Sequence, residues 1–185
     1  AKVAINGLFN IVLCGGKFDR DVNSAVGRVH YGNIRIIGTT TQDPSEAIEK
    51  IPATGEIRQG DIIDVIGAGG PMGVMHVIRN ICQGVKDVTI YAGDLDDSRL
   101  APLTKIAAPL AKERGVNYVP YNPKKGQGPK NVNYTAVMAP VPAIVAGAVK
   151  NSVKGAIINI FAGIPATVSG MIDLNTYIEK ELYFI

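Results

Sequence analysis

The stretch "GDIIDVIGAGGPMGVMHVIRNI", from Gly60 to Ile81, decides the fold of this 185-residue chain. It opens with the apolar run Ile62–Ile66, turns through four glycines, and continues from Met72 with apolar residues at helical spacing. A buried strand, a glycine turn and a helix in this order favour a parallel α/β unit, because the helix packs back onto the sheet. The glycine spacing is one residue longer than the G-x-G-x-x-G of dinucleotide-binding turns.

Further apolar runs bounded by glycines follow this unit. After residue 56, strands are predicted at Ile62–Ile66, Val88–Ala92, Tyr118–Val119, Tyr134–Met138, Ala156–Phe161 and Leu182–Ile185. Helices are predicted at Met72–Gln83, 97–114 with a kink or break at Pro109, Pro142–Lys150 and Met171–Tyr177, and a polar loop at 122–131. Six strands with crossovers are the count of a complete doubly wound domain, so we predict an α/β fold with a parallel sheet over residues 56–185.

Residues 1–55 are predicted to hold extra N-terminal strands, Phe9–Cys14 and Ile34–Ile37, and a linker. Shifting the chain by 148 residues places Ile34–Ile37 on Leu182–Ile185. The same shift places Asn6–Phe9 on Lys154–Ile157. This segment is therefore predicted to repeat the end of a nucleotide-binding unit, either as the tail of a preceding domain or as strands that extend this sheet. We expect the chain to be a fragment of a longer protein.

The composition narrows the class of protein. A hydrophobic share of 46% with 19% charged residues excludes a disordered chain. No apolar run approaches the roughly 18 residues of a membrane span, and a dispersed net charge of +3 does not suggest nucleic acid. Cys14 and Cys82 lie in apolar stretches and are predicted to be buried thiols. Because the sequence has no disulfide framework, a cytoplasmic location is expected. The cysteines and histidines have no metal-ligand spacing, and no metal site is predicted.

The glycine turn has an acidic partner at the expected distance. Glycines let the backbone approach a pyrophosphate, and the helix N-terminus supplies free N–H groups and a positive dipole. Asp94 follows the strand Val88–Ala92 and lies 21 residues beyond Gly73, where a carboxylate would bind ribose hydroxyls. The pattern predicts a nucleotide site, although a plain strand-to-helix turn with a surface aspartate is the alternative. Which of the residues from Gly67 to Gly70 faces the pyrophosphate is left open.

These residues resemble a known family. The opening stretch, with "VTIYAGDLDDSRL" (88–100), "KGAIINIFAGIP" (154–165) and "ELYFI" (181–185), resembles the cofactor domain of the medium-chain, zinc-type alcohol dehydrogenase-like superfamily over about residues 56–185. "AGGPMG" and "GRVHYGNIRIIGTT" (27–40) are most similar to its sorbose-1-phosphate reductase-like branch. The resemblance implies an NAD(P)-binding Rossmann-like domain of an oxidoreductase. Its reaction would be hydride transfer between the cofactor and an alcohol or polyol, sugar phosphates included.

The resemblance also implies the cofactor contacts. It places the pyrophosphate at Gly67, Gly69, Gly70, Pro71, Met72 and Gly73, the adenosine at Asp94, Leu95 and Arg99, and the nicotinamide side at Ala139, Pro140, Ala162 and Gly163. Asp94 favours NAD, since a carboxylate repels the 2′-phosphate of NADP. Arg99 could bind that phosphate, so NADP stays open.

No catalytic residue is identified in this chain. In the family the zinc ligands belong to a separate catalytic domain, and nothing here matches their pattern, so zinc is expected only in that missing domain and the fragment alone is expected to be inactive. His76 is predicted to be a packing or surface residue. The resemblance implies a homodimer through the edge strand Leu182–Ile185.

Two other classes of protein remain as alternatives. An S-adenosylmethionine-dependent methyltransferase also combines a glycine loop after the first strand with an acidic residue after the second. Against it, nothing in the sequence suggests the antiparallel hairpin that usually closes such sheets. The third hypothesis is a non-catalytic domain that senses a nucleotide or has a purely structural role.

Overall fold

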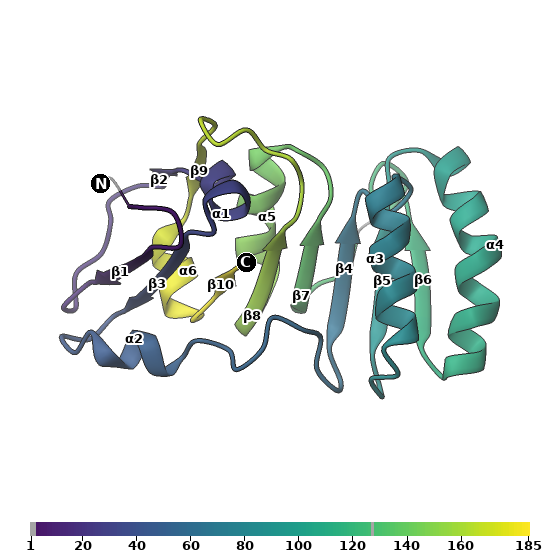
Figure 1. The fold of residues 1–185 in the computed structure, drawn as a ribbon, viewed down its shortest axis with the longest axis horizontal. Coiled ribbons are helices and arrows are strands. Elements are labelled where there is room, and N and C mark those ends of the chain that lie inside the picture. Colours follow the sequence, from purple (N-terminus) through teal and green to yellow (C-terminus); the bar gives the residue numbers. More distant parts are fainter. Residues whose placement is uncertain (1–2, 127) are drawn as a thin grey trace.

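The computed structural model describes residues 3–126 and 128–185, and a parallel sheet runs through its centre (Figure 1). In the described residues this sheet has six strands in the order β10-β8-β7-β4-β5-β6, and every neighbouring pair is parallel. The strand order reverses between β4 and β7, which is where ligands bind in doubly wound sheets. The α/β fold predicted from the sequence is confirmed. The strands are β4 (Ile62–Ile66), β5 (Thr89–Gly93), β6 (Asn117–Tyr121), β7 (Val132–Val137), β8 (Ser152–Ile160) and β10 (Tyr183–Phe184).

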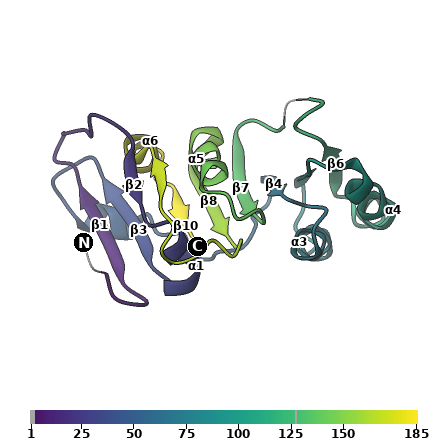
Figure 2. The ribbon, with the colours of Figure 1, turned by 90° about the horizontal axis from the view of Figure 1, so that it is seen from above.

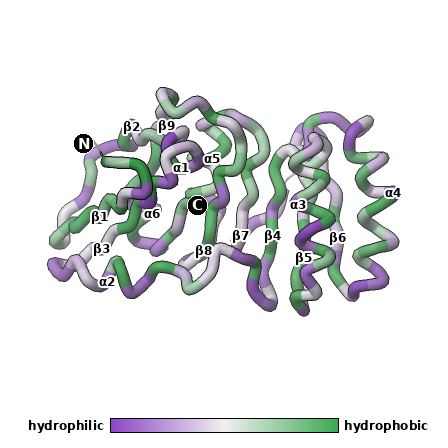
Figure 3. The backbone as a smooth tube through the Cα atoms, viewed as in Figure 1, coloured by the Kyte–Doolittle hydropathy of each residue, from purple (hydrophilic) through white to green (hydrophobic). Residues whose placement is uncertain are grey.

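Helices cover both faces of this sheet, as Figure 2 shows. On one face lie α3 (Pro71–Cys82) and α4 (Asp97–Arg114), and on the other α5 (Pro142–Asn151) and α6 (Leu174–Glu179). Successive side chains of a strand point to opposite faces, so Ile63 and Val65 join the core under α3 and α4 while Asp64 points the other way. In Figure 3, most of β4 is coloured hydrophobic and the turn before it hydrophilic.

The connection from β6 to β7 contains no helix within residues 122–126 and 128–131. This agrees with the polar loop predicted there. As far as the structure describes this connection, the sheet face over β4, β5 and β6 on the side of α5 is therefore covered by a loop and not by a helix (Figure 2). A face without a packed helix leaves room for a cavity.

The N-terminal segment packs against the far edge of the sheet. β1 (Leu8–Val12) and β3 (Arg35–Thr39) form a separate parallel pair, and β2 (Val22–Ser24) pairs antiparallel with β9 (Gly170–Ile172). Thus β1 and β3 are not hydrogen-bonded into the six-stranded sheet, although β3 lies beside β10. The remaining helices of the segment are α1 (Gly27–Gly32) and α2 (Ser45–Glu49).

Several local predictions are corrected. Cys14 and Cys82 are exposed, not buried. β1 ends two residues before Cys14, which takes a positive φ of 51° in a turn, and Cys82 lies one position past the buried face marked by Ile81. Met171 belongs to β9 rather than to a helix, because α6 begins only after the Asp173 cap.

The helix α4 continues without a break through Pro109, where the sequence predicted a kink or a break. Pro109 lies on the exposed side of the helix. A proline leaves one helix carbonyl without its N–H partner, and on the exposed side water can hydrate this carbonyl. The helix therefore tolerates a proline at position 109.

Candidate functional site

The glycine turn is fastened to the end of the neighbouring strand. The N–H groups of Gly67 and Ala68 both donate to the carbonyl oxygen of Gly93, at 2.8 and 2.9 Å. Gly67 has a φ of +87°, a conformation that favours glycine. Helix α3 starts directly afterwards, with Pro71 in its first turn, where a missing N–H costs nothing. The turn therefore presents the N-terminus of α3 at the carboxyl edge of the sheet.

Two of the turn glycines are required by close packing. A Cβ on Gly73 would lie 2.2 Å from the carbonyl oxygen of Gly67 and 2.6 Å from Cα of Ala68. A Cβ on Gly69 would lie 2.4 Å from Cβ of Arg99 on α4. The Cβ of an alanine at Gly70 would meet nothing closer than 3.6 Å. The lack of a side chain at Gly69 and Gly73 thus allows the turn and the two helices to pack closely.

The aspartate that the sequence paired with this turn is bonded to it. Oδ2 of Asp94 accepts a hydrogen bond from the N–H of Gly69 at 2.9 Å, and its Oδ1 accepts one from the N–H of Asp96 at 3.0 Å. Asp96 then caps α4 by accepting from the N–H of Ser98 at 2.8 Å. The carboxylate is consequently held in one orientation by backbone groups on both of its sides.

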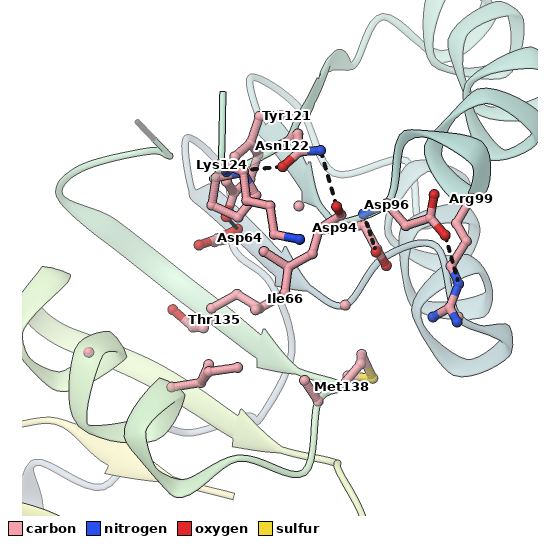
Figure 4. A pocket seen from close by; sticks show the side chains of 18 of the residues that line it. Asp64, Ile66, Asp94, Asp96, Arg99, Tyr121, Asn122, Lys124, Thr135 and Met138 are labelled. Carbon is pink, nitrogen blue, oxygen red and sulfur yellow. Dashed lines mark hydrogen bonds and ion pairs between the residues drawn. The ribbon is translucent and has the colours of Figure 1, made fainter. Parts of the chain in front are cut away.

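A cavity of about 1200 Å³ lies beside the turn, at the carboxyl ends of β4, β5 and β7. Figure 4 shows Asp64, Tyr121 and Lys124 at one side of it and Asp96 and Arg99 at the other, with Asp94 between them. Of the predicted cofactor residues, those that line the cavity are Gly67, Gly70, Asp94, Leu95, Arg99, Ala139 and Pro140. Those outside its lining are Gly69, Pro71, Met72, Gly73, Ala162 and Gly163.

Ala162 and Gly163 lie at the end of β8, next to the N-terminal segment. The N–H of Ala162 donates to the carbonyl oxygen of Val137 at 2.8 Å, which ties this loop to β7. A Cβ on Gly163 would lie 3.1 Å from the hydroxyl of Tyr31 in α1. Phe161 stacks edge-on against His76, which is buried, as a packing residue should be.

The lining of the cavity contains a polar pair that was not predicted from the sequence. Asp64 is only 4% exposed, and its Oδ1 accepts a hydrogen bond from the hydroxyl of Tyr121 at 2.9 Å. Burial raises the pKa of Asp64 to about 7, although the hydrogen bond from Tyr121 acts in the opposite direction. Burial also raises the pKa of Tyr121. The available signal was the single acidic residue inside the apolar run Ile62–Ile66.

The loop after β6, which lines the cavity, is bonded to the start of α4. Asn122 donates to Oδ1 of Asp97 at 2.8 Å, and Lys125 forms an ion pair with the same carboxylate. These two partners hold the pKa of Asp97 below its ordinary value. All of them are exposed or nearly so, hence the contribution of the ion pair to stability is small.

In residues 3–126 and 128–185, no three His, Cys, Asp or Glu side chains gather where they could hold a metal ion. None of the helices described here has both the length and the apolarity needed to cross a membrane.

The fold is similar to part of several solved dehydrogenase structures. 2R,3R-butanediol dehydrogenase from Bacillus subtilis matches with a TM-score of 0.53 and 20% identity, over 70% of this chain and 36% of its own. Benzyl alcohol dehydrogenase from Acinetobacter calcoaceticus gives 0.52 and 20%, over 69% and 34%. A zinc-binding dehydrogenase from Sinorhizobium meliloti 1021 bound to NADP gives 0.52 and 19%, over 68% and 36%.

The chain spans about a third of the length of these structures. No protein-family model matches the sequence. No curated protein sequence matches it either. The likeness is one of fold: the α/β, Rossmann-like architecture predicted from the sequence is confirmed, and these dehydrogenase structures share it.

Proposed function

We propose that the cavity binds a nicotinamide dinucleotide, and that the chain is the cofactor-binding part of an oxidoreductase acting on an alcohol or polyol. The observation that carries the proposal is the hydrogen bond between Asp94 and the N–H of Gly69. It joins an acidic residue to a glycine turn at a helix N-terminus, at the switch point of a doubly wound sheet. The nicotinamide ring supplies the hydride chemistry when the cofactor is bound.

The residues present fit the pyrophosphate of such a cofactor. The N–H groups of Met72 and Gly73 lie in the first turn of α3, where they have no partner within the helix. With the dipole of the twelve-residue helix they make an anion site. Gly67 and Gly70, which line the cavity, would admit the phosphates, and Gly69, Pro71 and Gly73 would shape the turn.

Residues around the cavity fit the two nucleosides. Each oxygen of Asp94 accepts one N–H, which leaves lone pairs free for ribose hydroxyls. Leu95 and Arg99 line the cavity near Asp94, where the adenosine would bind, and Ala139 and Pro140 line it after β7, beside Gly67. The nicotinamide would extend from there toward Ala162 and Gly163 beyond the lining.

We further propose NAD over NADP, because Asp94 would repel a 2′-phosphate. Arg99 lies at the same end of the cavity, and one structural neighbour is bound to NADP. A catalytic domain outside this chain would choose the substrate and hold any zinc, in line with the partial coverage of the neighbours. The sugar phosphate substrate, the sorbose-1-phosphate reductase-like branch, the division at residue 55 and the cytoplasmic location stay predictions.

A titration of the chain with NADH, followed by nicotinamide fluorescence, tests the proposal. We expect saturable binding that Asp94→Ala weakens at least tenfold. Asp87→Asn is the matched control, because Asp87 pairs with Gln59 in a loop outside the cavity lining. Equal binding by both variants, or binding of S-adenosylmethionine in place of NADH, would overturn the proposed function.

A further inference from the structure

The pairing of β2 with β9 follows the internal repeat of the sequence. The paired residues are Val22 with Ile172, Asn23 with Met171, and Ser24 with Gly170. Adding 148 to 22, 23 and 24 gives 170, 171 and 172, which are the bounds of β9. Exchanging each residue for its counterpart turns the first pair into the third and leaves Asn23–Met171 unchanged. A two-fold axis through this central pair has that property.

The surrounding elements follow the same relation. α1 begins at Gly27, and its counterpart α6 begins at Leu174. A shift of 148 residues would place this start at Asn175, so the two helices agree to within one residue. Each helix precedes a strand of a parallel pair, β1–β3 in one unit and β8–β10 in the other. The registers of these two pairs differ by one residue, since Arg35 faces Leu8 while Tyr183 faces Ile157.

A second pair of contacts is related in the same way. The packing of Gly27 against Pro165 is so close that a Cβ on Gly27 would lie 2.0 Å from the carbonyl oxygen of Pro165. At the related place, Asn175 accepts from the N–H of Phe18 and donates to its carbonyl oxygen, both at 3.0 Å. Asn175 is the counterpart of Gly27, and Phe18 lies within one position of the counterpart of Pro165. The N-terminus of each helix is thus covered by the loop of the other unit.

The joint between the units is a buried core. Val26 and Val29 of the N-terminal unit pack in one cluster with Val145, Tyr177 and Phe184, and all five are at most 1% exposed. Apolar burial of this kind is typical of permanent interfaces rather than of transient ones. The edge strand β10, where the family resemblance implies a homodimer contact, packs here against β3 of the same chain.

We propose that the surface formed by β9, α6 and β10 recognises a copy of its own fold, and that residues 6–39 supply this copy within the chain. The N-terminal unit then takes the place that the segment 154–185 of a second molecule would take in a two-fold dimer. The chain is consequently a monomer with respect to this surface. The partner of the surface is a structural repeat in cis, not a second subunit.

A cysteine pair across the axis tests the proposal. Cys14 and Cys82, both exposed, are first replaced by serine, and Asn23→Cys is combined with Met171→Cys. Both positions are exposed, and directly paired residues of antiparallel strands lie at a Cα separation that a disulfide spans. We expect mild oxidation to give a disulfide within one chain, seen as a monomer of altered mobility on a non-reducing gel. Each single variant is the control, since neither can form this bond.

The mass of the unmodified chain gives an independent readout. Light scattering over a hundredfold range of concentration is expected to show a monomer throughout. A disulfide that links two chains would mean that the N-terminal units are exchanged between molecules, and it would overturn the assignment in cis. A double variant that is folded by circular dichroism but forms no disulfide would overturn the pairing itself. A concentration-dependent dimer that Met171→Lys dissociates would show that the surface binds a second copy instead.

Discussion

The hydroxyl of Tyr121 donates a hydrogen bond of 2.9 Å to Asp64, and both residues line the cavity. The ring of Tyr121 packs closely against Gly93 and Gly128, because a Cβ on either glycine would lie within 3 Å of it. The pair therefore joins β4 to β6 across β5 beside the cavity.

Asp64→Asn is expected to change the pH dependence of stability. The pKa of Asp64 is raised from 3.8 to about 7 by folding, so the folded chain binds the proton more tightly than the unfolded chain. The unfolding free energy of the wild type should then fall as pH rises from about 4 to 7, by up to about 4 kcal/mol. Asparagine carries no charge, and the variant should lack this fall. Urea denaturation at half-unit steps of pH measures the difference between the two chains.

The control for that measurement is Asp87→Asn, at an exposed carboxylate. Its profile should run parallel to that of the wild type. Parallel profiles for Asp64→Asn as well would mean that the Asp64 carboxyl titrates normally in the folded chain.

Gly73→Ala is expected to destabilise the chain by about 2–3 kcal/mol, as overpacking does. The new Cβ would lie 2.2 Å from the carbonyl oxygen of Gly67, so the turn and α3 must separate. In Gly70→Ala, in the same turn, the new Cβ would lie no closer than 3.6 Å to another group, and the backbone of Gly70 is extended, with a φ of −78°. The free energy of unfolding of this variant should therefore change by no more than about 1 kcal/mol. Urea unfolding of both variants gives the comparison, and equal losses would rule out close packing as the role of Gly73.

Asp94→Ser is expected to raise the affinity ratio of NADPH to NADH at least tenfold, which corresponds to about 1.4 kcal/mol. The carboxylate that repels the 2′-phosphate is removed, while the serine hydroxyl can still accept from the N–H of Gly69. Asp97→Asn lines the same cavity but already has Lys125 as its partner, so its effect should be smaller. Fluorescence titration with each cofactor measures the ratio, and an unchanged ratio in Asp94→Ser would remove the argument for NAD.

Tyr177→Phe is expected to cost about 2–3 kcal/mol of unfolding free energy, since it leaves buried backbone groups without partners. The hydroxyl of Tyr177, on a residue 1% exposed, donates to the carbonyl oxygen of Ile36 at 2.6 Å and accepts from the N–H of Phe184 at 3.2 Å. Tyr183→Phe is the control, because the Tyr183 hydroxyl forms no hydrogen bond within the described residues. Urea unfolding with amide exchange at Phe184 measures both, and similar losses would contradict a role for the shared hydroxyl.

Most of the features that could be predicted from the sequence lie close together along the chain. The strand Ile62–Ile66, the glycine turn and α3 are continuous in sequence, and Asp94 follows the next strand, so hydrophobic periodicity and spacing sufficed. The bond between Asp94 and Gly69 then follows from the pairing of β4 with β5.

Contacts distant in sequence were not predictable in the same way. Asp64 and Tyr121 are 57 residues apart, and no pattern in either strand indicates the partner of a lone carboxyl. The burial of Cys14 and Cys82 was predicted wrongly because it depended on where a strand and a helix face end, to within one or two residues. The repeat was visible as a shift in the sequence, but its packing depends on buried side chains such as Val29 and Tyr177, which periodicity does not pair.

The antiparallel pair of β2 and β9 also affects how this interface responds to dilution. Two strands on separate molecules part when the protein is diluted, since association loses translational entropy each time it occurs. Here both strands belong to one covalent chain, so the local concentration of one near the other is set by the intervening residues. The stability that this contact adds is therefore independent of protein concentration, and the contact persists at the lowest concentrations that a cell maintains.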